Sequence, residues 1–250
     1  MTKKQEYNYL LRISYDGTRY LGWQRQKSSE KTIQGKIEAI LSIMTGESVE
    51  INGSGRTDAG VHAVEQIANF KTGIDLDPLE IRDYLNRYLP EDIGVNRVER
   101  AEPRFHARLN AKAKTYCYTI NNSGVTDVFC HRFQYFYPAK LDVSRMREAA
   151  ALMTGRHDFR KCSFAKRTRK STVRTIYEIT ISEENGIIQI SYRGDGFLYN
   201  MVRILTGTLI EVGRGAMKVE EINRLFDPED ETRAGFTAPA GGLTLMNVEY

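Results

Sequence analysis

The stretch that organises this chain reads Gly53-Ser54-Gly55-Arg56-Thr57-Asp58-Ala59-Gly60-Val61-His62-Ala63. It places one carboxylate, Asp58, close to the cation of Arg56 in a loop that contains three glycines. Glycine permits positive φ angles and the close approach of another molecule, and a neighbouring cation favours the ionised form of a carboxyl group. The loop is therefore a candidate site for a nucleophilic or proton-abstracting aspartate. A polar hairpin loop with a surface Arg–Asp pair is the alternative.

The segments around this loop predict one complete α+β unit. Apolar and polar residues alternate in the expected strands, and Thr32–Met44 has a helical apolar face. Asp77, Pro78 and Glu80 form the start of a second helix. The order is β-α-β-β-α-β, as in the ferredoxin-like split unit. The expected strands are 9–15, 49–53, 66–71 and 93–100, and the expected helices are 32–44 and 77–89.

The second half of the chain predicts a second unit of the same kind. The expected strands are 114–120, 175–182, 187–193 and 243–250, and the expected helices are 142–153, 197–212 and 219–226. The two units meet near residues 104–112, and no low-complexity linker separates them. We therefore expect domains at 1–105 and 106–250, merged sheets and a cleft at the seam.

Composition places the chain among ordinary soluble proteins. It has 250 residues, 41% hydrophobic and 27% charged, which is enough to build a core. No apolar run approaches 18 residues and the start lacks the apolar core of a signal peptide, so we expect neither export nor a membrane span. Three cysteines without C-x-x-C spacing predict free thiols in the cytoplasm and no metal site.

The net charge of +4 hides a strong asymmetry. Residues 97–175 hold 18 basic and six acidic side chains, a difference of +12, and residues 160–174 hold seven basic side chains and no acid. Aromatic residues are interleaved with these charges. The combination favours a nucleic acid that is bound through phosphates and stacked bases, and a solubilising surface is the alternative.

The glycine spacing excludes the familiar cofactor loops. A dinucleotide fingerprint needs G-x-G-x-x-G, but the glycine after Gly55 is Gly60. A phosphate loop needs Lys and Ser/Thr where Val61 and His62 stand, and a zinc protease needs a second histidine after His62. We therefore expect no cofactor and no metal.

Further motifs accompany the loop along almost the whole chain. They are Tyr15–Thr18, Gly22–Gln26, Leu89–Ile93, Phe105–Arg108, Lys114–Tyr118, His157–Phe159, Val173–Ile176, Gly196–Arg203 and Thr237–Leu245. Together with the loop, these motifs resemble those of the TruA family of tRNA pseudouridine synthases. The chain departs from the family pattern in two places: residues 160–164 are more basic than expected, and Phe236 stands where proline is usual.

The resemblance implies an isomerase that converts uridine to pseudouridine at positions 38, 39 and 40 in the anticodon arm of tRNA, without a cofactor. It also implies two ferredoxin-like (RRM-like) subdomains that share one extended antiparallel sheet, in a homodimer. Asp58 takes the place of the essential aspartate of the family. Asp58 would either attack C1′ or remove a ribose 2′ proton, and the sequence leaves both roles open.

Four other positions are candidate substrate-binding residues, and the resemblance implies the roles of three of them. Arg203 matches the arginine that pairs with the aspartate; snorkelling out of its apolar helix is the alternative. Tyr116 matches the tyrosine that stacks on the target base, although Tyr118 shares its strand face. Leu243 matches an apolar contact to uracil. Arg56 is expected at RNA phosphates or at the flipped nucleotide.

Two other functions compete with the isomerase. A non-catalytic RNA-binding module of two RRM-like units explains the charge and the aromatic residues, but not Asp58 beside Arg56, and the RNP-type strand motif is absent from the sequence. A nucleotide-binding hydrolase is disfavoured by the loop spacing.

Overall fold

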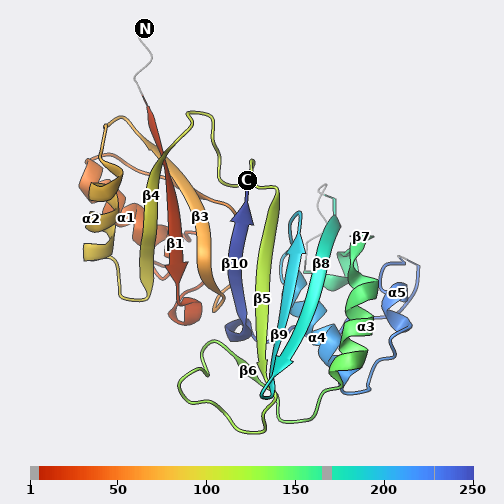
Figure 1. Cartoon of the computed structure of the whole chain (residues 1–250). Coiled ribbons are helices and arrows are strands. Elements are labelled where there is room, and N and C mark those ends of the chain that lie inside the picture. Colours follow the sequence, from red (N-terminus) through yellow and green to blue (C-terminus); the bar gives the residue numbers. More distant parts are fainter. Residues whose placement is uncertain (1–5, 165–170, 228) are drawn as a thin grey trace. The chain divides into compact units, whose positions relative to one another are not determined.

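The computed structural model describes residues 6–164, 171–227 and 229–250. The chain forms two compact units, the first made of Met1–Lys112 with Leu245–Tyr250 and the second of Ala113–Thr244. Both contain helices and antiparallel strands (Figure 1). The predicted α+β class is therefore confirmed.

The first unit has the order strand, helix, two strands, helix, strand. Its strands lie in the order β4-β1-β3, with β2 paired to β3, and all of these pairs are antiparallel. Helices α1 and α2 contact each other beside these strands (Figure 1). The elements are β1 (Tyr7–Tyr15), α1 (Ile33–Thr45), β2 (Ile51–Gly53), β3 (His62–Thr72), α2 (Pro78–Tyr88) and β4 (Ile93–Ala101).

Local sequence signals account for these elements. In β1 the buried residues Tyr9, Leu11 and Ile13 alternate with less buried neighbours, as a strand with one core face requires. Helix α1 begins where the Thr32 side chain accepts a hydrogen bond from the Gly35 N–H, and ends at Gly46, whose φ is +65°.

The second unit is built around the antiparallel strand order β5-β9-β8-β7, with the short β6 parallel to β5. Helix α3 contacts β8, α4 and α5. The elements are β5 (Ala113–Asn121), β6 (Tyr135–Phe136), α3 (Val143–Met153), β7 (Gly155–Asp158), β8 (Val173–Glu184), β9 (Ile187–Gly194), α4 (Met201–Gly213) and α5 (Glu221–Arg224). The last strand, β10 (Leu243–Glu249), crosses into the first unit at Leu245.

Several element bounds differ from the sequence prediction, and strands β6 and β7 were not predicted. Helix α4 begins at Met201 rather than Phe197, because Asn200 has a left-handed backbone (φ +60°) that a continuous helix excludes. Strand β3 begins at His62 rather than Gln66. Strand β7, at residues 155–158, was not predicted; four polar or small residues carry little periodicity.

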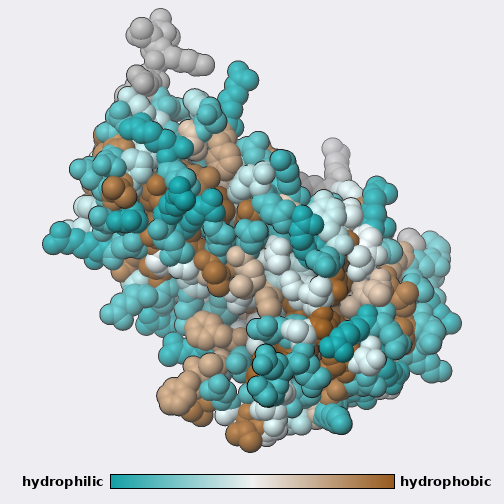
Figure 2. Space-filling model, in the orientation of Figure 1, coloured by the Kyte–Doolittle hydropathy of each residue, from teal (hydrophilic) through white to brown (hydrophobic). Residues whose placement is uncertain are grey.

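Apolar side chains are exposed on the segment between β5 and β6. Val125, Val128, Phe129 and Phe133 are all exposed, and Phe129 is 91% accessible. Figure 2 shows hydrophobic side chains gathered at the lower edge of the view, where this segment runs, on an otherwise largely hydrophilic face. Exposed apolar groups of this size are typical of a contact surface.

The described residues contain neither a candidate membrane-spanning helix nor a candidate metal site. No helix in 6–164, 171–227 or 229–250 is long and apolar enough to span a membrane. Within the same ranges no cluster of three or more His, Cys, Asp or Glu side chains could hold a metal ion. The three cysteines, Cys117, Cys130 and Cys162, are free thiols.

Helix α4 packs backbone against backbone on the segment that follows α5. A Cβ atom on Gly207 would lie 1.8 Å from the Phe236 carbonyl oxygen, and one on Gly235 would lie 2.6 Å from the Thr208 nitrogen. The Gly235 N–H donates to the Thr208 hydroxyl (2.9 Å), and the Ala238 N–H donates to the Arg203 carbonyl (3.1 Å). These contacts fix the segment against the helix.

Gly207→Ala should therefore destabilise the protein although alanine favours helices. The methyl group has no room beside a backbone carbonyl, and overpacking costs roughly 1–3 kcal/mol. Because about 2–4 °C of Tm correspond to 1 kcal/mol at this size, thermal unfolding should show a clear loss. Gly196→Ala is the control, since its Cβ would meet nothing nearer than the Arg174 side chain at 3.8 Å. Equal Tm values in the two variants would contradict the packing argument.

Candidate active site

The loop that carries Asp58 connects β2 to β3 in the first unit. Asp58 is half-buried, Thr57 before it is buried and Arg56 is exposed. The Val61 N–H donates to the Asp58 carbonyl at 3.1 Å, and Gly60 takes a φ of +79° in the turn between them. One of the three loop glycines thus supplies the positive φ that the sequence predicted.

A buried network of four polar side chains lies beneath this loop. The Ser54 hydroxyl donates to Gln66 Oε1 (2.6 Å), and Gln66 Nε2 donates to the Gly55 carbonyl (3.1 Å) and to the Tyr15 hydroxyl (3.5 Å). The Tyr15 and Thr57 hydroxyls share a hydrogen bond of 2.8 Å. Desolvation raises the pKa of Tyr15 to about 12, so its phenol is neutral at physiological pH. The network connects the loop to β1 and β3.

The segment after β1 clamps the loop from the other side. A Cβ atom on Gly17 would lie 2.0 Å from the Val61 carbonyl oxygen, and one on Gly22 (φ +92°) would lie 2.7 Å from the Thr57 carbonyl oxygen. The Trp23 N–H donates to that Thr57 carbonyl at 3.1 Å. The Gly17 N–H donates to Nδ1 of the buried His62 at 3.0 Å. These contacts explain physically why Tyr15–Thr18 and Gly22–Gln26 accompany the loop in the sequence.

Arg56 does not hold Asp58 in an ion pair. Its side chain is exposed, and in the part of the chain that the structure describes it makes no salt bridge. The pairing that the sequence suggested for these two residues is therefore absent, because the loop presents the guanidinium to solvent. An exposed arginine at the lip of such a loop remains suited to phosphate contact.

In the second unit, β5 presents two tyrosines whose surroundings differ. The Tyr118 hydroxyl donates to the Pro239 carbonyl at 2.8 Å, and burial raises its pKa. Tyr116 is 7% exposed and packs edge-on against Phe197, with ring centroids 5.3 Å apart. The two residues share a strand face, as predicted.

Arg203 lies in the first turn of α4 and is half-buried. Its Nε donates to the Ala238 carbonyl (2.7 Å) and its Nη1 to the Asn200 side-chain oxygen (2.9 Å). Both acceptors are uncharged. The structure thus holds the guanidinium beside the helix start rather than letting it extend into solvent.

The segment from Ala238 to Leu243 joins the side chains of this unit. It contacts Arg203 through Ala238, and Tyr118 through Pro239 and Gly242. A Cβ atom on Gly242 would lie 2.6 Å from the Tyr118 ring, so only glycine fits there. Leu243, 4% exposed, follows directly as the first residue of β10.

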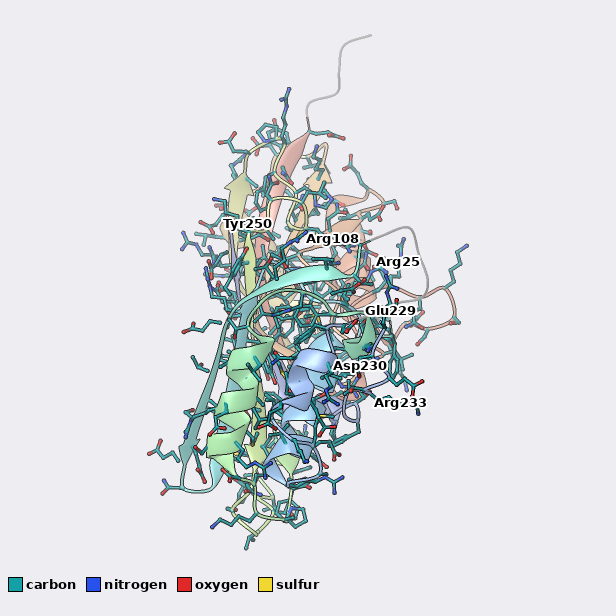
Figure 3. The ribbon with its side chains drawn as sticks, turned by 90° about the vertical axis from the view of Figure 1, so that its right-hand side faces the viewer. Arg25, Arg108, Glu229, Asp230, Arg233 and Tyr250 are labelled. Atoms are coloured by element: carbon teal, nitrogen blue, oxygen red, sulfur yellow. The ribbon has the colours of Figure 1, made fainter. Side chains whose placement is uncertain are left out.

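The basic segment is only partly available to a ligand. Residues 165–170 of 160–174 lie outside the described residues. Lys161 Nζ donates to the backbone carbonyls of Asp227 (2.7 Å), Arg224 (3.4 Å) and Asp230. Figure 3 shows Asp230 beside Glu229 and Arg233 on the segment after α5. Lys161 is part of the basic segment 160–174. Its ammonium group instead binds backbone carbonyls within the second unit.

The predicted residues are divided between the two units. Asp58 and Arg56 belong to the first, and Tyr116, Arg203 and Leu243 to the second. Sequence reasoning did not assign roles to the supporting residues Tyr15, Thr57, Gln66 and Asn200. Tyr15, Thr57 and Asn200 lie in the quoted motifs, which was the available signal.

Known proteins resemble this chain over almost its whole length. A family model described as "tRNA pseudouridine synthase" matches residues 12–110 and 149–250. A protein of Bacillus sp. (strain KSM-64) named tRNA pseudouridine synthase A is 49% identical over 97% of this chain and 99% of its own length. Proteins of Bacillus anthracis and Clostridium tetani, named tRNA pseudouridine synthase A 2 and A 1, are each 46% identical over 97% of this chain and 99% of their own lengths.

These relatives match the chain almost from end to end, and the matched regions include both the Asp58 loop and the α4 segment that carries Arg203. The chain therefore belongs to the tRNA pseudouridine synthase family.

Proposed function

We propose that this protein isomerises uridine to pseudouridine at positions 38, 39 and 40 in the anticodon arm of tRNA. Membership of the tRNA pseudouridine synthase family supports the reaction and the class of substrate. The observation that carries the assignment of the site is the Asp58 loop. A half-buried carboxylate stands there on a backbone fixed from both sides.

The reaction needs no net oxidation and no second substrate. The N1–C1′ bond breaks, the detached uracil turns, and C5 bonds to C1′ while the C5 proton is lost and N1 gains one. Asp58 is the essential residue in this proposal. It acts either as the nucleophile that takes C1′ when uracil leaves or as the base that removes the ribose 2′ proton.

Three side chains of the second unit complete the proposed site. Arg203 pairs with Asp58 and favours its ionised form; its hydrogen bonds to the Ala238 carbonyl and the Asn200 side chain support this role because they orient the guanidinium. Tyr116 stacks on the target base and assists the removal of the C5 proton. Leu243 supplies an apolar contact to uracil, and its position directly after the segment bound to Arg203 supports that role.

Arg56 contacts the RNA in this proposal. A base within the stem must leave the duplex before its glycosidic bond can react, and an inserted side chain holds the gap open. The exposure of Arg56 beside the half-buried Asp58 supports phosphate contact or support of the flipped nucleotide. No cofactor and no metal enter the proposed reaction.

We propose that the two halves are ferredoxin-like (RRM-like) subdomains that share one extended antiparallel sheet around a central cleft. Residues 1–105 carry the Asp58 loop, and 106–250 carry Tyr116, the basic segment and Arg203. The order of elements in the first unit and its strand order β4-β1-β3-β2 support this.

We also propose that the enzyme works as a homodimer in the cytoplasm, with no membrane partner. The exposed apolar side chains between β5 and β6, Phe129 foremost, support association with another protein surface. The three free thiols support a reducing compartment.

Asp58→Asn tests the catalytic assignment. The amide keeps the size of the carboxylate but is uncharged, a far poorer nucleophile and no base at neutral pH. We expect a folded protein that binds tRNA at least as tightly as the wild type and releases no tritium from C5-labelled uridine in tRNA. Turnover comparable with the wild type would overturn the role of Asp58, and loss of folding would favour a structural role for the loop.

Tyr116→Phe tests the hydroxyl apart from the ring. The aromatic face remains, so tRNA affinity should hold, while turnover should fall if the hydroxyl takes part in proton removal. Tyr116→Ala should also lose stacking, worth ~1–3 kcal/mol, in a tRNA binding assay. Tyr118→Phe is the control, because its hydroxyl is bonded to the Pro239 carbonyl. Wild-type turnover in Tyr116→Phe would limit Tyr116 to packing or stacking.

Arg203→Met tests the proposed ion pair with Asp58. Breaking such a buried pair from one side costs ~3–5 kcal/mol. Without the cation the carboxyl group gains its proton at a higher pH, so turnover should collapse and the acid limb of the pH–rate profile should shift upward. Arg224→Met, on helix α5, is the matched control for loss of an arginine. An unchanged profile in Arg203→Met would mean that the pairing is wrong.

A further inference from the structure

We propose that Thr57 and Tyr15 are positioning residues for Asp58, and that their shared hydrogen bond fixes the backbone from which the Asp58 carboxylate projects. This inference rests on the proposed function of Asp58. It concerns a hydroxyl pair that lies beneath the loop and out of contact with solvent. Tyr15 is 5% exposed and Thr57 is 6% exposed.

The network connects Thr57 to both β1 and β3. Gln66 Oε1 accepts from the Ser54 hydroxyl, and Gln66 Nε2 donates to the Tyr15 oxygen. The Tyr15 and Thr57 hydroxyls share a hydrogen bond of 2.8 Å in which either can be the donor. Burial raises the pKa of Tyr15 to about 12, so its phenol stays neutral at physiological pH.

Thr57 is held at two points by different segments of the first unit. Its hydroxyl is bonded to Tyr15 at the end of β1, and its carbonyl accepts the Trp23 N–H at 3.1 Å. The carbonyl of Asp58 accepts the Val61 N–H at 3.1 Å. The backbone is thus held immediately before and immediately after the Asp58 Cα.

Removing the Thr57 hydroxyl should change the position of the Asp58 carboxylate, and should have less effect on the binding of RNA. The buried Tyr15 hydroxyl would lose its hydrogen-bond partner, and an unpaired buried polar group makes the native position of the loop unfavourable. Small displacements of a reacting group lower the rate steeply. The exposed groups proposed to bind RNA, such as Arg56, are unchanged. The expected signature is a loss in kcat without a matching change in KM.

The experiment compares Thr57→Val, which keeps the shape and removes the hydroxyl, with Thr57→Ser, which keeps the hydroxyl. We expect Thr57→Val to lower kcat for tritium release from tRNA about tenfold or more, with KM for tRNA within about twofold. Thr57→Ser should restore most of the lost kcat. Each kcat is normalised to the folded fraction measured by circular dichroism.

Thr45→Val is the matched control for loss of a buried threonine hydroxyl. Thr45 is also 6% exposed and donates to the Leu41 carbonyl at 2.9 Å, in the last turn of α1. This variant should lower the thermal midpoint while kcat stays at the wild-type value. A purely structural role of Thr57 would make the two valine variants behave alike.

Tyr15→Phe tests whether the two hydroxyls act through one bond. It should lower kcat as Thr57→Val does, and the double variant should be no slower than the slower single variant, because the interaction is already lost. Multiplied effects in the double variant would overturn the proposed pair. Wild-type kcat in Thr57→Val, or equal losses in the serine and valine variants, would overturn it as well.

The same assays distinguish this inference from the function on which it rests. Asp58→Asn with wild-type turnover would overturn the proposed role of Asp58, and with it any positioning of that residue. An inactive Asp58→Asn together with an unaffected Thr57→Val would leave the proposed function standing and overturn only the positioning role.

Discussion

The close contact between the Asp58 loop and the segment that follows β1 is the constraint on which the first half of the site depends. Two backbone carbonyls, those of Thr57 and Val61, lie where the Cβ atoms of Gly22 and Gly17 would be in any other residue. At this distance neither a side chain nor water fits between the two segments, so their close packing restricts the loop to one position. The buried hydroxyls of Tyr15 and Thr57 then fix its register without adding a charge.

In the second unit, glycines allow the same kind of close backbone packing around Arg203. Gly207 and Gly242 allow the segment from Phe236 to Leu243 to approach α4 on one side and the Tyr118 ring on the other. Carbonyl groups of that segment accept hydrogen bonds from Arg203 and Tyr118. Both halves of the proposed site therefore stand on rigid backbone contacts, which suits a reaction that requires accurate placement of a base against a carboxylate.

Sequence patterns predicted most of the fold because strand alternation and helix capping are local. The start of α1 at Thr32 and of α2 at Asp77 followed from capping side chains alone. The start of α4 did not, since the left-handed Asn200 is imposed by tertiary contact. Likewise, Asp58 was recognisable from its loop, whereas the Tyr15–Thr57 bond joins residues 42 positions apart that no local pattern connects. Similarly, the short distance between Arg56 and Asp58 in the sequence does not determine the direction of the Arg56 side chain, which is exposed.

Two hydrogen bonds of Arg203 show how the second unit orients a cation. Nε donates to the Ala238 carbonyl and Nη1 to the Asn200 side-chain oxygen. Both acceptors lie on backbone that is itself fixed, since Asn200 has a left-handed conformation before α4 and the segment around Ala238 packs on the helix through Gly207. A planar guanidinium that is oriented in this way loses less side-chain freedom when it binds an anion. Arg56, in contrast, is exposed, and water and salt weaken its field.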